Sequence, residues 1–321
     1  MTTRIAKLAD HQHPDGRWVL LRDRRGDTEG CVVPLPEGID LSALLRLSGE
    51  GRRALIAATL QADCAAKTDD SSRPLLAPLD SDTEVWAAGV TYQASREARM
   101  GESADSDVYA RVYDADRPEL FFKSIGWRVR GPESTIGIRQ DSSWNVPEPE
   151  LAVVVDASGE IAGYTICNDV SSRSIEGENP LYLPQAKLFR GSCAVGPWIV
   201  PEWEIPDAYA LAINIRIDRG IRPDPNAEPL WQGATSTARL HRRLDELVSW
   251  LYRCDVFPSG AILSTGTCVV PDDSLTLEPG DLVSIVIDGI GTLRNTVSHG
   301  PAGFADQLGA GPRGAELVVS A

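Results

Sequence analysis

The sequence predicts an α+β fold rich in β-structure, in which a small N-terminal α/β unit precedes a larger strand-rich domain. After about residue 82, short apolar segments alternate with Gly, Pro and Asp, and few segments have a helical pattern. A polar stretch at residues 67–73, followed by Pro74 and Pro78, is typical of a linker. We therefore expect a small domain at residues 1–80 and a main domain at residues 81–321.

The N-terminal unit has signals for both strands and helices. Alternation predicts a strand at residues 18–21, followed by a turn at residues 25–27. Helical patterns begin at Leu41 and extend over residues 52–66, where Leu55, Ile56 and Leu60 share one face. The mixture supports a compact α/β unit.

The main domain contains two recognisable hairpins and one clear helix. Strands at residues 150–155 and 161–167 flank a turn at residues 157–159. A second hairpin combines a strand at residues 282–287 with a turn at Asp288-Gly289. A helix at residues 239–254 places apolar side chains on one face, namely Leu240, Leu244, Leu247, Val248 and Leu251. We expect that face to pack against a sheet.

Composition limits the class of protein and its partners. Of 321 residues, 42% are apolar and 24% are charged, which is typical of globular proteins. The 31 basic and 46 acidic residues give a net charge of −15, which opposes binding to nucleic acid or anionic lipid. A small metabolite or a protein is the partner that this charge favours.

Cysteine use and hydropathy suggest the compartment. No stretch approaches the roughly 18 apolar residues of a membrane span, and residues 1–10 lack an apolar signal core. The six cysteines are scattered without a CxxC pair, and the four histidines are too few for a His-rich metal site. We expect a cytoplasmic protein with reduced thiols and no association with membranes.

Three carboxylates should converge at the open end of the first hairpin. Glu148 and Glu150 project to the same side of an extended segment, about 7 Å apart. The returning strand brings Asp169 beside Glu148. Clustered like charges repel one another, so a cation is expected, and oxygen ligands suit Mg²⁺, with Mn²⁺ or Ca²⁺ as substitutes. The alternative is that these acids lie on a solvated strand face.

The flanking segments resemble the fumarylacetoacetate hydrolase family. The segments are WNVPEPE at 144–150, NDVSSR at 168–173, PELFFK at 118–123, STGT at 264–267 and PGD at 279–281. In that family the two glutamates of an ExE pair and the aspartate of an NDxS segment bind the metal, positions that Glu148, Glu150 and Asp169 fit. The resemblance covers residues 82–297. It implies a mixed β-sheet roll around a metal site after a small N-terminal domain, assembled as a homodimer or homotetramer.

Within this family, the chain looks like the 2-dehydro-3-deoxy-D-arabinonate dehydratase branch. The segments SSRSIEGENP at 171–180 and VWAAGVTY at 85–92 carry that similarity, whereas hydrolases more often have SARDxQ. No histidine lies between His13 and His241 to form a His-Glu dyad that activates water. The resemblance implies that a 2-keto-3-deoxy pentonate, a small 2-oxo sugar acid, is dehydrated to 2,5-dioxopentanoate through a Mg²⁺-stabilised enolate.

Three other functions remain open at this point. The same metal could serve an acylpyruvate-type C–C hydrolase or an oxaloacetate-type decarboxylase. A non-enzymatic alternative is a metal-binding sensor of sugar acids that has lost activity.

The family pattern also suggests which residues act on the substrate. Dehydration needs at least two proton-transfer groups, and Lys187 and Glu119 are the candidates, in either order of acid and base. The alternative role of Lys187 is a counter-charge to the carboxylates, and that of Glu119 is a surface salt bridge. Candidate substrate-binding residues are a turn and nearby polar side chains, namely Gly266, Thr267, Lys123, Arg173 and Ser171. Gly266 could also be present for its turn alone, and the two cations for structural ion pairs.

Overall fold

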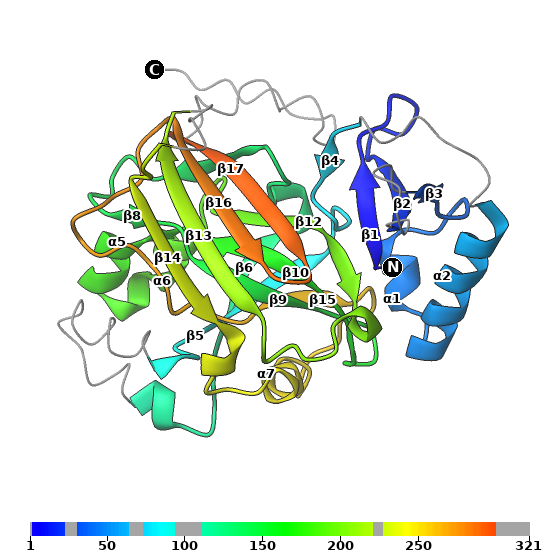
Figure 1. The fold of residues 1–321 in the computed structure, drawn as a ribbon. Helices are drawn as coiled ribbons and strands as arrows, with labels where there is room; N and C mark the ends of the chain where they lie inside the picture. The colour runs from blue at the N-terminus through cyan, green and yellow to red at the C-terminus, as the bar shows by residue number, and fades with distance from the viewer. Residues whose placement is uncertain (1, 23–30, 64–72, 94–110, 221–226, 300–321) are drawn as a thin grey trace, which may run out of the picture.

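The computed structural model describes residues 2–22, 31–63, 73–93, 111–220 and 227–299 of the chain. Figure 1 shows a strand-rich body with the N-terminal strands and helices gathered at one end of it. Neighbouring strands run both parallel and antiparallel, so the sheets are mixed. The expected α+β fold rich in β-structure is confirmed.

The larger sheet combines the N-terminal strands with strands from the middle of the chain and with β15. Within the described residues its order is β3 (Cys31–Pro34), β2 (Arg17–Arg22), β1 (Thr3–Leu8), β12 (Cys193–Pro201), β10 (Ile161–Asp169), β9 (Pro149–Val155), β15 (Ala261–Ser264), β5 (Glu84–Gly89) and β6 (Glu119–Ile125), with β4 (Leu75–Leu76) beside β1. The pairing of β15 with β5 is parallel, and the other pairs are antiparallel.

A second sheet packs over the centre of the first. Its order is β14 (Trp231–Ser236), β13 (Ala212–Arg219), β16 (Asp281–Ile287), β17 (Gly291–His299) and β7 (Thr135–Ile138). A short separate pair joins β8 (Asn145–Val146) to β11 (Ser171–Ser172). That pair holds the segment that follows Asp169 beside the segment that precedes Glu148.

Short helices connect the strands. The α-helices are α1 (Leu41–Leu45), α2 (Gly49–Asp63), α5 (Arg173–Glu178), α6 (Leu183–Lys187) and α7 (Leu244–Leu251). The 3₁₀ turns are η2 (Gly126–Arg128), η3 (Pro180–Tyr182), η4 (Glu202–Glu204) and η5 (Thr237–Arg239). Helices α5 and α6 follow directly after β11 and therefore lie next to the open end of the first hairpin.

Strand β9 lies at the centre of the hydrophobic core and is covered on both faces. Leu151, Val153 and Val155 belong to a cluster with β13, β16 and α7, whereas Ala152 and Val154 pack with α1 and α2. Because successive side chains of a strand point to opposite faces, an uninterrupted apolar run suits a strand buried on both sides. This rigid strand carries Glu150 into the site.

The N-terminal unit shares its core with the main domain. Strand β1 pairs with β12, and Ile5 lies in the same apolar cluster as Val154. A buried ion pair at 3.3 Å also joins Arg52 of α2 to Asp156, which follows β9. The division at residue 80 stays a prediction. The predicted turn at residues 25–27, the end of the helix at 64–66 and the linker residues 67–72 lie outside the described residues.

Both hairpins and the early strand are confirmed, but two helices have different bounds. The helix predicted at residues 239–254 was too long. Leu240 forms a β-bridge with Tyr92 and the His241 N–H donates to the Thr91 carbonyl, so tertiary hydrogen bonds delay the helix until Leu244. Helix α2 begins at Gly49, three residues before the predicted start, because Ser48 caps its first turn.

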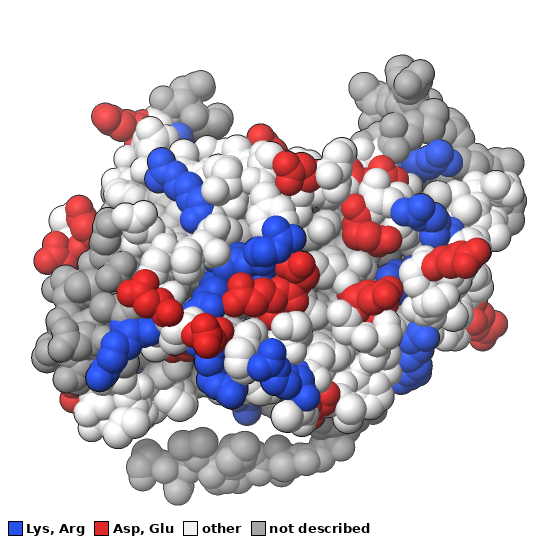
Figure 2. All heavy atoms as spheres, turned by 90° about the horizontal axis from the view of Figure 1, so that it is seen from below, with Lys and Arg blue, Asp and Glu red and all other residues white. Residues whose placement is uncertain are grey.

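Charged side chains of both signs are mixed on the surface. Figure 2, a view from below, shows basic and acidic groups next to one another over the middle of that face. The net charge of −15 is therefore not gathered into a single acidic patch there.

Candidate active site

The first hairpin brings three carboxylates together, as the sequence predicts. Glu150 lies in β9, Asp169 ends β10, and the Asp169 N–H donates to the Glu148 carbonyl at 3.0 Å. Each carboxylate contributes an oxygen to a cluster whose members lie within 4.8 Å of one another. All three side chains are buried. The alternative of a solvated strand face is therefore wrong.

Glu150 is enclosed by polar donors and by the other acids. Its Oε2 accepts hydrogen bonds from Ser264 Oγ at 2.5 Å and from the Gly266 N–H at 2.8 Å. Burial raises the pKa of Glu150 well above its usual range, the carboxylates of Asp169 and Glu148 raise it further, and the bond from Ser264 opposes them. A cation close to these three acids would stabilise the ionised form of Glu150.

Two basic side chains that line the pocket contact the carboxylates. Lys187 Nζ, from the last turn of α6, donates to Glu148 Oε2 at 2.8 Å, to Asp169 Oδ2 at 3.1 Å and to Ser171 Oγ at 2.6 Å. The Arg173 guanidinium forms an ion pair with Glu148 Oε1 at 3.0 Å. The predicted neighbourhood of Lys187, Arg173 and the cluster is thus present.

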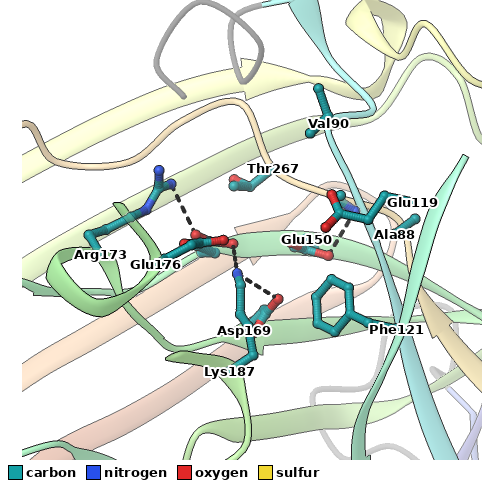
Figure 3. Close-up of a pocket in the computed structure, with 13 residues that line it drawn as sticks. Ala88, Val90, Glu119, Phe121, Glu150, Asp169, Arg173, Glu176, Lys187 and Thr267 are labelled. Carbon is teal, nitrogen blue, oxygen red and sulfur yellow. Dashed lines mark hydrogen bonds and ion pairs between the residues drawn. The ribbon is translucent and has the colours of Figure 1, made fainter. Parts of the chain in front are cut away.

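These groups line one pocket, which Figure 3 shows from close by. Glu119 and Phe121 from β6 lie on one side of it and Arg173 on the other. The lining residues are Ala88, Gly89, Val90, Glu119, Phe121, Glu148, Glu150, Asp169, Arg173, Glu176, Lys187, Gly266 and Thr267. Both candidates for proton transfer, Lys187 and Glu119, therefore face the same space as the carboxylates.

Two glycines permit close contacts at this site. A Cβ on Gly89 would lie 2.0 Å from Glu119 Oε2, so the glutamate packs directly over that backbone. Gly266 has a φ of +92°, and a Cβ there would lie 2.0 Å from Thr91 Oγ1. Because the Gly266 N–H already donates to Glu150, the substrate contact expected from this turn is left to Thr267.

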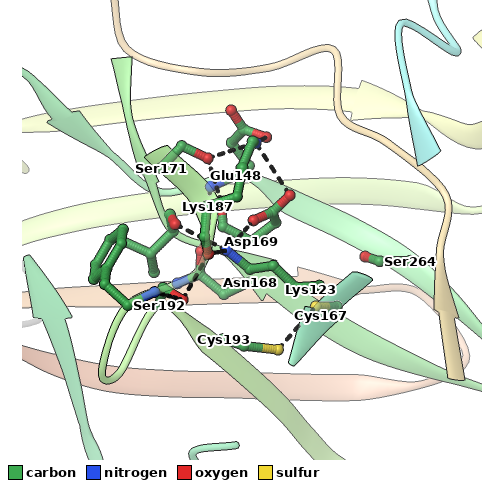
Figure 4. A network of polar contacts seen from close by, with 12 residues as sticks. Lys123, Glu148, Cys167, Asn168, Asp169, Ser171, Lys187, Ser192, Cys193 and Ser264 are labelled. Carbon is green, nitrogen blue, oxygen red and sulfur yellow. Dashed lines mark hydrogen bonds and ion pairs between the residues drawn. The ribbon is translucent and has the colours of Figure 1, made fainter. Parts of the chain in front are cut away.

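Lys123 and Ser171 do not line the pocket, so the structure does not favour the substrate contacts predicted for them. Lys123 is 1% exposed, and its three ammonium hydrogens are directed at Asp169 Oδ1, the Val170 carbonyl and the Lys187 carbonyl (Figure 4). Ser171 Oγ donates to the Asp169 carbonyl at 2.9 Å and accepts from Lys187. Both side chains lie behind the pocket and do not line it.

Glu176, Phe121 and Val90 also line the pocket but were not predicted from the sequence. Glu176 is buried and lies three residues after Arg173 in α5, so both residues occupy one helical face. The spacing of Arg173 and Glu176 was the available signal, but α5 is only six residues long and lies within a polar segment. Lys187 Nζ lies 5.7 Å from the centre of the Phe121 ring, within range of a cation–π contact.

The residues fit a hard divalent cation. Glu148, Glu150 and Asp169 offer only carboxylate oxygens, the donors that Mg²⁺, Mn²⁺ and Ca²⁺ prefer. Burial raises the pKa of Glu150, so its ionised form is disfavoured without more positive charge nearby, which a bound cation would supply.

Comparisons with known proteins agree with this site. The family model "Fumarylacetoacetate (FAA) hydrolase C-terminal" matches residues 84–298. The probable 2-keto-3-deoxyxylonate dehydratase of Haloferax volcanii is 48% identical over 245 residues, which are 76% of this chain and 82% of that protein. The 2-dehydro-3-deoxy-D-arabinonate dehydratase of Saccharolobus solfataricus is 43% identical over 220 residues, covering 67% and 72%.

A solved structure gives the same result at the level of the fold. It is 2-keto-3-deoxy-D-arabinonate dehydratase complexed with magnesium and 2,5-dioxopentanoate, with a TM-score of 0.73 and 32% identity over 92% of this chain and 99% of that one. The similarity to the dehydratase branch is thereby confirmed. Because the family model matches well over half of its length, the chain belongs to the fumarylacetoacetate hydrolase family.

Proposed function

We propose that the protein is a Mg²⁺-dependent dehydratase that converts a 2-keto-3-deoxy pentonate, such as 2-dehydro-3-deoxy-D-arabinonate, to 2,5-dioxopentanoate. The observation that carries this proposal is a pocket in which three clustered carboxylates face the same space as Lys187 and Glu119. The names of two relatives and the ligands of a related solved structure support it.

Glu148, Glu150 and Asp169 are the residues that would hold Mg²⁺, with Mn²⁺ or Ca²⁺ as possible substitutes. When bound, the metal polarises the 2-keto group and stabilises the negative charge that develops after a proton leaves C3, an effect of several kcal/mol. Lys187 Nζ donates to Glu148 and Asp169 and so orients these two carboxylates.

Proton transfer falls to Lys187 and Glu119. A proton must leave C3 and another must reach the departing C4 hydroxyl, which gives an enone with a C3=C4 double bond. The enone then loses a proton from C5 and regains one at C3 to form an enol, which takes up a proton at C4 and loses its C5 hydroxyl proton as the aldehyde forms. We assign the C3 proton to Lys187 and the C4 hydroxyl to Glu119, which lie on different elements around the pocket. Glu176 supplies a further carboxyl group in the same pocket, and we assign the binding of substrate oxygens to Arg173 and Thr267, which also line it.

The hydrolase alternative lacks the histidine of a His-Glu dyad among the described residues that line this pocket. All four histidines lie in described segments, at positions 11, 13, 241 and 299, and none of them lines the pocket. A His-Glu dyad is therefore absent among the pocket residues that the structure describes.

The test is formation of product by the purified protein with Mg²⁺. Both the D- and L-isomers of the 2-keto-3-deoxy pentonate are supplied, and 2,5-dioxopentanoate is followed through its NADP-dependent oxidation. Absence of product from both isomers would contradict the proposal. Loss of diketone absorbance with an acylpyruvate would identify a hydrolase, and formation of pyruvate from oxaloacetate would identify a decarboxylase. Binding of the sugar acid without turnover would identify a sensor.

We further propose that the protein acts in the cytoplasm as a homodimer or homotetramer. In the described part of the chain, none of the helices is both long and apolar enough to cross a membrane. The described cysteines, Cys31, Cys167, Cys193, Cys254 and Cys268, are free thiols, which supports a reducing compartment. Light scattering on the purified protein measures the oligomer size.

A further inference from the structure

Lys123 is held in an unusual position behind the carboxylate cluster. It belongs to β6, and the register between β5 and β6 shifts at this point: Val85 pairs with Ser124, whereas Trp86 pairs with Phe122. Residue 123 is thus the extra residue of a β-bulge. Bulges redirect a side chain that regular pairing would send elsewhere. Here the redirected side chain is a lysine that is almost completely buried.

The Lys123 ammonium contacts two parts of the site at once. It forms an ion pair with Asp169 Oδ1, while Asp169 Oδ2 lies 3.1 Å from Lys187 Nζ. It also donates to the Lys187 carbonyl at 2.6 Å and to the Val170 carbonyl at 3.1 Å. Figure 4 shows Lys123 between Asp169 and the segment that carries Lys187. All three of its donors are used, and none is left for a substrate.

The contact with the Lys187 carbonyl matters because α6 is short. The helix has five residues and ends at Lys187, and the last carbonyls of a helix have no partner within the helix itself. The Lys187 carbonyl instead accepts from Lys123 Nζ and from Ser192 Oγ at 2.8 Å. These two bonds fix the backbone from which the Lys187 side chain reaches Glu148.

From these contacts we propose that Lys123 is a positioning residue that orients Asp169 as a metal ligand and Lys187 as a proton-transfer group. The inference rests on the proposed metal site. A role as a mere counter-charge predicts the opposite effect on metal binding, because removing a positive charge should tighten the binding of a cation. Loss of orientation should weaken it, since partners behind metal ligands are typically worth about 10- to 100-fold in affinity.

Lys123→Met, with Lys7→Met as a matched control, separates these two roles. Lys7 is also a buried lysine whose Nζ donates to a backbone carbonyl, that of Leu79 at 3.0 Å, but it lies in β1 of the N-terminal unit. Affinity for Mn²⁺ is measured by electron paramagnetic resonance and affinity for Mg²⁺ by calorimetry. We expect about 10- to 100-fold weaker binding for Lys123→Met and wild-type binding for Lys7→Met. At saturating Mg²⁺, kcat of Lys123→Met should still be lowered, because Lys187 has lost a tether.

Equal or tighter binding of Mn²⁺ by folded Lys123→Met would overturn the proposal. Lys123→Arg keeps the charge but moves the donors, so it should also weaken binding, and wild-type affinity in that variant would overturn the proposal as well. A crystal structure of the wild-type protein with Mg²⁺ needs no variant: Asp169 Oδ1 should remain on Lys123, and separation of the two groups would refute the idea. Wild-type protein that binds neither ion would instead refute the proposed metal site.

Discussion

The two hairpins of the main domain both place a buried acid at their open ends, but with different consequences. In the β9–β10 hairpin, Glu150 and Asp169 meet Glu148 beside a pocket. In the β16–β17 hairpin, Asp281 is fully buried, accepts the Glu278 N–H at 2.9 Å and forms an ion pair with Arg219 Nε at 3.0 Å.

The difference between the hairpins lies in what surrounds each acid. Asp281 is held by one turn and one arginine, and it does not line the pocket. In the first cluster, Glu148 and Asp169 share Lys187, and each has a second basic partner, Arg173 and Lys123 respectively. A buried acid alone is therefore weak evidence of a site; several acids around a pocket, with a cation held in common, are much stronger evidence.

The largest expected effect is loss of activity when the cluster is altered. Glu148→Gln, Glu150→Gln and Asp169→Asn should each weaken Mn²⁺ binding and lower kcat/KM by about 10³-fold or more, because several kcal/mol of charge stabilisation are lost. Asp281→Asn in the other hairpin is the control and should leave kcat/KM unchanged. Coupled assays and Mn²⁺ titrations measure both. Wild-type activity in all three cluster variants would show that the acids of the first hairpin are no more important for activity than Asp281.

Metal removal should abolish activity but spare the fold. Excess EDTA should reduce turnover to background, and added Mg²⁺ should restore it. Because Lys187 and Arg173 pair with the carboxylates without a metal, circular dichroism should show unchanged secondary structure. Activity that persists in EDTA would contradict a metal role for the first hairpin.

Substituting the proton-transfer residues should slow the chemical step without weakening metal binding as the cluster variants do. Glu119→Gln should lower kcat by about 10²- to 10⁴-fold, the usual worth of general acid–base catalysis, with Mn²⁺ affinity close to wild type. In D₂O, this variant should still exchange C3 protons of the substrate, as followed by proton NMR, whereas Lys187→Met should not. Exchange of the C3 protons by Lys187→Met but not by Glu119→Gln would show that the two residues have the opposite roles.

Gly89→Ala tests how closely Glu119 must be held. The new Cβ would lie 2.0 Å from Glu119 Oε2, the far end of a flexible side chain, so the glutamate should move while the fold remains. We expect kcat to fall by about 10- to 100-fold, less than full removal of an acid–base group. Gly280→Ala, beside Asp281, is the matched control. Gly280 has a φ of +92° and open space around it, so the alanine should lower the free energy of unfolding by about 1–2 kcal/mol and leave kcat unchanged. An equal effect of both changes on kcat would argue against the placement of Glu119.

The sequence predicts the frame of the site better than the direction of individual side chains. The hairpin and the convergence of Glu148, Glu150 and Asp169 follow from strand periodicity and a turn, and the family resemblance assigns them to a metal. The orientation of Lys123 depends on a β-bulge that leaves no mark in the local pattern, so the sequence does not predict that this side chain lies outside the pocket lining.

Short helices and tertiary hydrogen bonds account for the other differences. Glu176 was missed because α5 is too short to show periodicity in a polar segment. The helix predicted at residues 239–254 was too long because the β-bridge between Leu240 and Tyr92 joins residues distant in sequence. Both features arise only when the chain is folded.

The smallest expected effect concerns the stability that Asp281 provides. Asp281→Asn keeps the shape of the side chain and removes its charge. It loses the ion pair with Arg219, whose side chain is half exposed, but also the cost of burying an ionised carboxylate, so the unfolding free energy measured in urea should change by no more than about 1 kcal/mol. Burial raises the pKa of Asp281 above its usual 3.8, despite the Glu278 N–H and Arg219. Between that value and the raised pKa, the folded state binds more protons than the unfolded state, so this group makes stability fall as pH rises. The unfolding free energy of wild type minus that of Asp281→Asn should therefore fall as pH rises through this window. A difference that grows instead would show that the ion pair with Arg219 outweighs burial.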